Sequence, residues 1–261
     1  MSKISFLSNI NMDPIGRFFD SKSDDLFFAN YNQYVFELID KKSKTNKDSF
    51  DIVILHLDGS EFLSRYTNSK NNISTKKNKI RTELSSLFDS IEVYLKNNKK
   101  SYFIINTLSL PPFFTNTFLD NIPNFSSSIL KNYANDKIKQ FALKYTNLVI
   151  MDLERIINLY GYNNLYDEKF YYLGRIKYNH LGLSVISEEL KRLVKAFTGK
   201  IKKVIILDLD NTLWGGVIGE DGLSGVKLSE DGIGKAYRDF QKTLKRVKDQ
   251  GIILAVCSKN N

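Results

Sequence analysis

The feature of this sequence that most limits its possible folds is an alternation of short apolar runs with longer amphipathic segments. The apolar runs are continuous, rich in Ile, Val, Leu or Phe, and cover residues 4–8, 51–57, 102–106 and 148–151. Short runs of this kind are typical of parallel strands that helices cover on both faces. The intervening segments with helical periodicity are 25–39, 76–95 and 128–145. The pattern predicts a three-layer α/β domain.

A second domain is expected to begin near residue 199. The helix predicted over 183–197 stops at Gly199, and a new apolar strand follows at 204–207. Glycine commonly ends helices. Beyond this strand come a glycine-rich stretch over 214–225, a helix over 231–250 and a strand over 252–256. Two strands are fewer than a doubly wound sheet normally has. We therefore expect domains at 1–198 and 199–261, the second being the first part of a Rossmann-like domain.

The amino-acid composition limits which partners and which cellular locations are expected for this chain. The chain has 38 Lys and Arg against 29 Asp and Glu, a formal net charge of +9, but its basic residues are mostly scattered Lys. Scattered charge favours a solvated surface over a nucleic-acid site. Because no run approaches ~18 apolar residues, we expect no membrane span. The single cysteine excludes an intrachain disulfide and fits a reducing, cytoplasmic location.

Two carboxylates, Asp208 and Asp210, directly follow the apolar strand at 204–207. The carboxyl ends of strands in an α/β sheet face the ligand crevice, where crowded carboxylates need a cation or a proton. Phosphoryl transfer uses such a pair, because one carboxylate attacks phosphorus and the other donates and then accepts a proton. Magnesium bound through oxygen would offset the negative charge. The alternative is a pair of solvated turn carboxylates.

The run from Asp208 to Thr212 resembles motif I of the haloacid dehalogenase (HAD) superfamily, Asp-x-Asp-x-Thr after a hydrophobic strand. The resemblance implies that Asp208 is the nucleophile, that Asp210 is the general acid and base, and that both bind Mg²⁺. Motif II of the superfamily follows the next strand, where Ser258 would hold the phosphoryl oxygens. Three further phosphate-binding residues are implied: Asn211, Thr212 and Lys259.

The stretches 208–222 and 255–260 are very similar to FkbH-like proteins, HAD subfamily IIIC, and the similarity extends upstream through 171–175. Such proteins take a phosphoglyceryl unit from 1,3-bisphosphoglycerate, remove phosphate and load the glyceryl group onto an acyl carrier protein thiol. The resemblance implies magnesium-dependent phosphotransfer or dephosphorylation of an acyl phosphate, coupled to acyl transfer. Cys257 is either an acyl relay or a small buried strand residue.

HAD catalysis also uses a later Lys and late acidic residues, which the sequence up to Asn261 does not show. We therefore expect the HAD domain to be incomplete in this chain and the chain alone to be weakly active or inactive.

FkbH-like proteins begin with a domain that resembles the SGNH hydrolases, whose site has a Ser after the first strand and a late Asp-x-x-His. Ser8 and His180 fall at these places, but Lys177 stands where the acid is expected. Asn106 is a loose counterpart of the family's Gly-x-Asn-Asp block. A His without its carboxylate is a weaker base. Three interpretations stay open: an SGNH-type esterase, a non-catalytic carrier-binding module, and polar residues with structural roles only.

Overall fold

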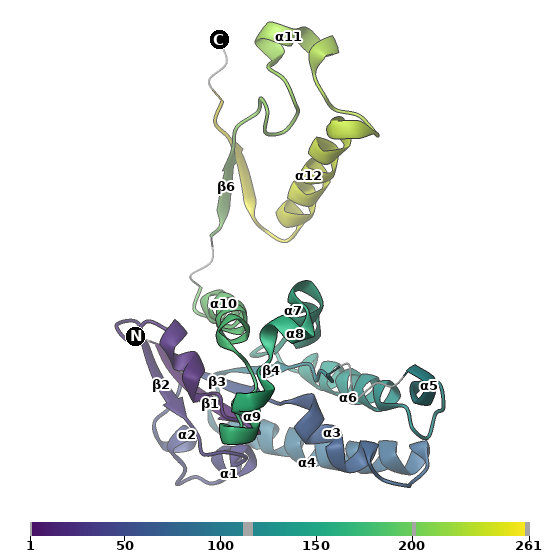
Figure 1. Cartoon of the computed structure of the whole chain (residues 1–261). Helices are drawn as coiled ribbons and strands as arrows, with labels where there is room; N and C mark the ends of the chain where they lie inside the picture. The colour runs from purple at the N-terminus through teal and green to yellow at the C-terminus, as the bar shows by residue number, and fades with distance from the viewer. Residues whose placement is uncertain (1, 112–116, 200–201, 259–261) are drawn as a thin grey trace. The chain divides into compact units, whose positions relative to one another are not determined.

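The computed structural model describes residues 2–111, 117–199 and 202–258, and the chain divides into two compact units. The first unit is Met1–Thr198 and the second is Gly199–Asn261 (Figure 1). Each unit has its own parallel sheet.

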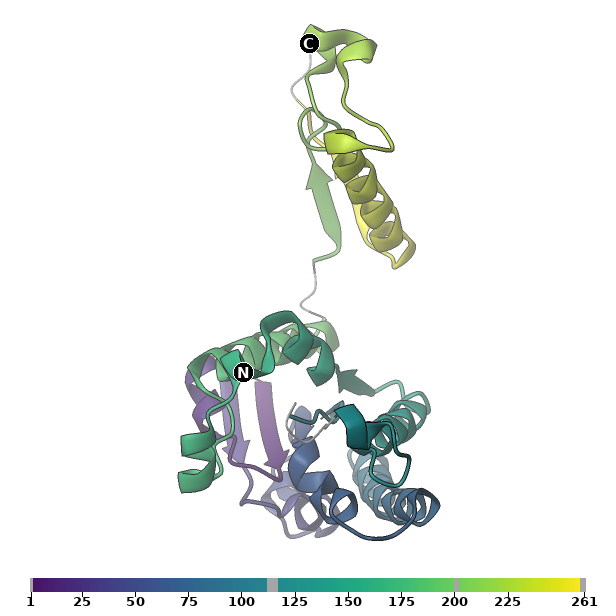
Figure 2. The same cartoon turned by 45° about the vertical axis from the view of Figure 1, so that its right-hand side comes forward.

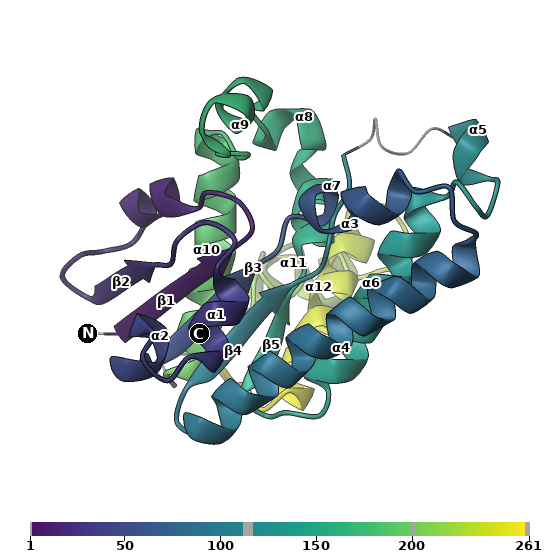
Figure 3. The ribbon, with the colours of Figure 1, turned by 90° about the horizontal axis from the view of Figure 1, so that it is seen from below.

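The sheet of the first unit has five parallel strands in the order β2-β1-β3-β4-β5. Figure 3 shows this succession from the edge strand β2 across to β5. The strands are β1 (Ser2–Ser8), β2 (Asp24–Phe28), β3 (Ile52–His56), β4 (Tyr102–Asn106) and β5 (Leu148–Met151). The order reverses direction between β1 and β3, and in open α/β sheets ligands bind at the carboxyl ends of strands at such a point.

Helices cover both faces of this sheet, which confirms the predicted three-layer α/β fold (Figures 1 and 2). One layer contains α1 (Tyr34–Ile39), α3 (Gly59–Thr67), α4 (Ile73–Asn97) and α6 (Ser127–Ala142). The other contains the 3-10 helix η1 (Asp13–Phe18), α7 (Leu153–Tyr160), α8 (Tyr162–Leu165) and α10 (His180–Phe197). Three short helices complete the unit: α2 (Lys44–Lys47), α5 (Thr117–Asp120) and α9 (Glu168–Gly174).

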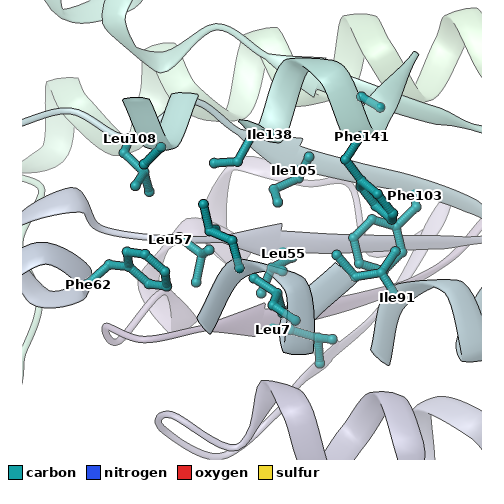
Figure 4. Close-up of a cluster of buried hydrophobic side chains, with 14 of the residues drawn as sticks. Leu7, Leu55, Leu57, Phe62, Ile91, Phe103, Ile105, Leu108, Ile138 and Phe141 are labelled. Atoms are coloured by element: carbon teal, nitrogen blue, oxygen red, sulfur yellow. The ribbon is translucent and has the colours of Figure 1, made fainter. Parts of the chain in front are cut away.

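The two layers are held by alternating side chains of the strands, because successive residues of a strand point to opposite faces. Val53 and Leu55 of β3 pack under α3, α4 and α6, whereas Ile52 and Ile54 pack on the opposite face. Figure 4 shows the buried hydrophobic cluster on the face of the sheet that carries Leu55, in which side chains of the sheet and of the helices lie together. Full burial of one such side chain contributes about 1.5–3 kcal/mol.

The prediction of one helix over 25–39 was wrong for its first part. Residues Asp24–Phe28 form the edge strand β2, and only Tyr34–Ile39 is helical. The strand is held by contacts with distant residues: Phe28 stacks on Phe6 of β1 at 4.9 Å between ring centroids, and Phe27 stacks on Phe50 at 5.8 Å. Because Asp is depleted in strands, the local sequence gave little sign of this pairing.

The second unit pairs β6 (Val204–Leu207) with β7 (Ile253–Val256) in parallel, and Leu207 is aligned with Val256. Between the strands lie α11 (Ile218–Gly225), which is kinked at Gly222, and α12 (Gly232–Asp249). In the part of the chain that the structure describes, no helix is long and apolar enough to cross a bilayer.

Candidate active site

The carboxyl ends of β6 and β7 bring the two halves of the predicted phosphotransfer site to one edge of the second sheet. Asp208 follows Leu207, and Cys257 and Ser258 follow Val256. The Cys257 amide donates a hydrogen bond of 2.8 Å to the Leu207 carbonyl, so the parallel pairing continues up to these residues. The Asp208 side chain is exposed, and Ser258 is half-buried.

The Asp210 carboxylate is held in place by two donors from its own loop. The indole Nε1 of Trp214 donates to Asp210 Oδ1 at 2.9 Å, and the Ile218 amide donates to the same oxygen at 3.3 Å. Oδ1 is thereby held in one position. Sequence reasoning did not foresee this hydrogen bond between Trp214 and Asp210.

The loop after Asp210 is closed by Asn211, whose φ of 53° lies in the left-handed region. Its side-chain Oδ1 accepts from the Gly216 amide at 2.9 Å, and its own amide donates to the Gly216 carbonyl at 3.2 Å. Gly216 has a φ of 96°, and a Cβ there would lie 2.9 Å from Asp221 Oδ2. The Asn211 carboxamide therefore braces the loop, while Thr212 is half-buried beside it.

The residues present fit a magnesium ion, although they do not form a complete site. Mg²⁺ prefers oxygen ligands and usually takes one or two carboxylates together with waters and substrate phosphates. The exposed Asp208 carboxylate and the Asp210 main-chain carbonyl are donors of this kind. Within residues 2–111, 117–199 and 202–258, no group of three or more His, Cys, Asp and Glu side chains could hold a metal. Lys259 lies outside the described residues.

Cys257 is exposed at the same edge, next to Ser258. The alternative expectation, a small buried strand residue, is wrong for this unit, because β7 ends one residue earlier. A thiol in this position is accessible to a substrate held between the two strand ends.

In the first unit, the structure does not join Ser8 to His180. The Ser8 hydroxyl is buried, donates to the His56 carbonyl at 2.8 Å and accepts from the Ile10 amide at 3.1 Å. His180 is exposed at the start of α10, and its ring packs edge-on against Phe18 at 5.1 Å. Among the described residues no hydrogen bond connects the two side chains, so the nucleophile–base contact of an esterase is not formed.

Lys177, which stands where an SGNH hydrolase has its acid, forms a buried ion pair instead. Its Nζ lies 2.7 Å from the Asp58 carboxylate and also donates to the Ser60 hydroxyl. Asp58 follows β3 and caps α3 by accepting from the Glu61 amide at 2.9 Å. The ion pair therefore occupies the carboxyl end of β3, beside the point where the strand order reverses. Sequence reasoning missed Asp58, although a carboxylate just after a buried strand is a pattern that indicates a candidate site residue.

Asn106 is the last residue of β4 and has a structural role. Its Oδ1 accepts from the Leu57 amide at 2.7 Å, and its Nδ2 donates to the carbonyls of Leu57 and Thr107, each at 2.8 Å. The carboxamide thus ties the end of β4 to the end of β3. These bonds account for its buried polar atoms and leave it unsuited to hold a substrate oxyanion.

His56 is the other histidine of the chain and is fully buried at the end of β3. Its Nε2 shares a hydrogen bond of 2.9 Å with the Tyr178 hydroxyl, whereas Nδ1 has no partner in the described part of the chain. Burial lowers the pKa of His56 to about 4, and Lys177 acts in the same direction against the opposing effect of Asp58. His56 is therefore neutral near neutral pH.

Among solved structures, the chain is similar over its whole length to the N-terminal part of protein BF1531 from Bacteroides fragilis, which contains a phosphatase domain and was crystallised with Mg. The two are 26% identical with a TM-score of 0.84, and the match covers 69% of that chain. No protein-family model matches the sequence, and no curated protein matches it significantly.

Two hydrolases overlap about three quarters of this chain with lower scores. A lipase/acylhydrolase from Enterococcus faecalis is 10% identical over 75% of this chain and 96% of its own, with a TM-score of 0.47. A carbohydrate esterase family 3 protein from Talaromyces cellulolyticus is 13% identical over 76% of this chain and 99% of its own, with a TM-score of 0.45. The full-length similarity, by contrast, covers both units of the chain.

Proposed function

We propose that residues 199–261 form the first part of a magnesium-dependent phosphotransfer site, with Asp208 as nucleophile and Asp210 as acid and base. The observation that carries this proposal is the shared edge of β6 and β7, where Asp208 and Ser258 follow strand ends aligned by the Leu207–Val256 register. The similarity to a Bacteroides fragilis protein with a phosphatase domain and bound Mg supports it.

In this reaction a carboxylate oxygen of Asp208 attacks the substrate phosphorus, and the bond from phosphorus to the leaving oxygen breaks. Asp210 gives its proton to that oxygen, then takes one from the water that releases phosphate from Asp208. The Ser258 hydroxyl donates to a phosphoryl oxygen. A bound magnesium ion would neutralise the negative charge gathered there.

The substrate we propose is a small acyl phosphate such as 1,3-bisphosphoglycerate, and the acceptor is the thiol of an acyl carrier protein. The exposed Cys257 thiolate would attack the C1 acyl carbon of 1,3-bisphosphoglycerate and release the C1 phosphate, whereas Asp208 would remove the phosphate at C3, so that a glyceryl group remains as a thioester on Cys257. The thiolate of the carrier protein would then attack the thioester, take the acyl group and restore the Cys257 thiolate. This relay places the acyl group beside the phosphoryl-binding edge.

A binding experiment tests the phosphotransfer site without relying on turnover. Trp214 is the only tryptophan of the chain and contacts Asp210, so its fluorescence reports on this loop. Mg²⁺ with beryllofluoride, which mimics an aspartyl phosphate, should change this fluorescence in the unaltered chain. Asp208→Asn should abolish the response, whereas the exposed Asp239→Asn on α12 should retain it. An identical response in the Asp208→Asn variant would exclude Asp208 as the nucleophile.

The acyl-transfer step needs a separate assay. Phosphate release from 1,3-bisphosphoglycerate is measured with Mg²⁺ and carrier protein for the 261-residue chain and for a version extended through the later HAD residues, and the intact mass of the carrier is recorded in the same samples. A glyceryl adduct that depends on Cys257, tested with Cys257→Ser, supports the relay. If beryllofluoride binds but the carrier gains no adduct, the phosphotransfer site is supported and transfer of a glyceryl group to the carrier is excluded.

A further inference from the structure

A cavity of about 210 Å³ in the first unit is walled largely by tyrosine rings. The four rings belong to Tyr162, Tyr166, Tyr171 and Tyr172. Tyr162 and Tyr166 are stacked at 3.8 Å between ring centroids, and Tyr171 meets Tyr172 edge-on at 5.3 Å. These residues belong to α8 and α9 and the turn between them, so the aromatic wall comes from one continuous stretch of chain. The phosphotransfer site uses none of them.

The ring faces at this cavity already attract two positive charges of the chain itself, Lys177 and Arg175, and the Arg175 guanidinium lies 5.4 Å from the centroid of the Tyr171 ring. Lys177 Nζ lies 5.7 Å from the centroid of the Tyr166 ring and 5.4 Å from that of Tyr171. The face of an aromatic ring carries negative electrostatic potential, so an ammonium group placed over it is stabilised. Lys177 lines the cavity but is turned into the protein, where its ammonium pairs with Asp58 at 2.7 Å.

The charges around the cavity leave a negative excess. Lys177 is neutralised by Asp58, and Glu61 by Arg175 at 3.2 Å. The cavity is also lined by Asp167 and Glu168. No basic side chain of the described residues forms an ion pair with either of these. An anion entering the cavity would therefore meet two carboxylates without an ion-pair partner among the described residues and an ammonium group that is already paired. One of these carboxylates, Asp167, also caps α9 by accepting from the Phe170 amide at 3.0 Å.

The ionisation of Tyr162 reflects the same negative surroundings. Burial raises the pKa of its phenol, and the negative charges of Asp58 and Glu168 raise it further. The phenol thus stays neutral and adds no charge to the cavity. On a chain whose formal net charge is +9, a negative, aromatic cavity is a local exception to the overall charge.

We propose that this cavity binds the ammonium group of a small organic cation, held by the tyrosine faces and by the carboxylates of Asp167 and Glu168. Aromatic faces joined to acidic groups are the recognition chemistry for quaternary and primary ammonium ligands. The site lies in the first unit and is independent of the proposed phosphotransfer. Its test therefore needs no catalytic activity.

Three probes of similar shape and different charge separate the electrostatic contribution from simple burial of apolar surface. Choline is the cation, 3,3-dimethylbutan-1-ol is its neutral isostere, and 3,3-dimethylbutanoate is the anion. Binding to the full chain is followed through the methyl resonance of each probe in NMR titrations. We expect choline to bind at least about fivefold more tightly than the alcohol, and the anion to bind most weakly. Non-specific attraction to a chain of net charge +9 would give the reverse order.

Two substitutions at the rim locate the binding. Tyr172, which is 82% exposed, and Glu168, which is also exposed, can be changed with little effect on folding. Tyr172→Ala and Glu168→Gln should each weaken choline binding about two- to fivefold. The controls Tyr160→Ala and Glu188→Gln, whose residues do not line the cavity, should leave it unchanged. Equal binding of choline and its neutral isostere, no binding of choline, or insensitivity to both rim substitutions would each overturn the proposal.

Discussion

The positions of single polar atoms decide what the two strand-end sites can do. In the second unit, Asp210 Oδ1 accepts from the Trp214 indole and from the Ile218 amide, so the carboxylate cannot rotate freely. In the first unit, the Ser8 hydroxyl makes its hydrogen bonds with main-chain groups rather than with a histidine. The Asp210 carboxylate is therefore held in one orientation, while the Ser8 hydroxyl is used for structure.

Trp214→Phe should lower phosphate release because it keeps an aromatic ring and removes the N–H that holds Asp210. Loss of a hydrogen bond to a charged group costs about 1.5–3 kcal/mol, which corresponds to a decrease of roughly tenfold or more. Since Trp214 positions the acid, kcat should decrease and KM should stay close to its original value. The measurement is steady-state phosphate release with Mg²⁺ by a protein that also carries the later Lys and acidic residues of HAD catalysis. A rise in KM with unchanged kcat would show that Trp214 acts on substrate binding instead.

His56 should make the folded state less stable at acid pH. Its pKa is lowered to about 4 when folded, against an ordinary value near 6.5, so below pH 6.5 the unfolded chain binds a proton that the folded chain does not. The contribution of neutral His56 to the free energy of unfolding is fully present above pH 6.5. It decreases by about 1.4 kcal/mol per pH unit below that, or by about 3 kcal/mol in all, as the pH falls to 4.

The two histidines of the chain provide a matched test of this effect. Urea denaturation between pH 4 and 7 should show a flatter pH dependence for His56→Gln, which can still bond the Tyr178 hydroxyl. The exposed His180→Gln should keep the original slope. A slope that disappears with His180→Gln and survives in His56→Gln would contradict the assignment.

At the scale of elements, the ion pair between Lys177 and Asp58 joins the segment before α10 to the end of β3 and the start of α3. Both side chains are buried, with 7% and 2% exposure, so each charge depends on the other. The Asp58 loop is further tied to the end of β1, because the Asp58 amide donates to Asn9 Oδ1 at 2.7 Å. The pair thus fixes three elements at the carboxyl end of β3.

Lys177→Met should destabilise the first unit by about 3–5 kcal/mol, because it leaves the Asp58 carboxylate buried without a countercharge. Adding Asp58→Asn should recover part of this loss, since the amide is neutral. Lys195→Met, an exposed lysine on α10, is the control and should change the free energy of unfolding little. Urea denaturation gives all of these values. Equal destabilisation by the single and the double variant would mean that the unpaired charge is not the cause.

At the scale of the whole molecule, stability is concentrated in the first unit. Both large hydrophobic clusters are built from residues before 198. In the second unit, apolar side chains of the two-stranded sheet remain exposed, among them Ile206 at 67% and Ile253 at 60%. The first unit therefore holds its own core, whereas the described part of the second buries little apolar surface.

Residues 1–198 should consequently fold alone, with a urea midpoint close to that of the main transition of the full chain. The reason is that their core needs no side chain from the second unit. Circular dichroism and urea denaturation of the two proteins check this expectation. A fragment that is unfolded, or that has a much lower midpoint, would show that residues beyond 198 contribute to the core.

The sequence by itself determined the alternating order of most strands and helices in both units. Hydrophobic periodicity is a local property, so β1, β3, β4 and β5 could be located from short windows of residues. The same reasoning put Asp208 and Ser258 after the ends of two apolar strands, and strands of a parallel sheet end at one edge. These conclusions needed only neighbouring residues and the known geometry of α/β sheets.

Only the tertiary structure decided the features that depend on distant partners. The strand β2 exists because it pairs with β1 and because Phe28 stacks on Phe6, which its own acidic sequence does not indicate. The pairing of Lys177 with Asp58 joins residues 119 positions apart and replaces the expected hydrolase contacts. No local pattern encodes which buried charges will meet, because that choice is made by the packing of elements from the whole first unit.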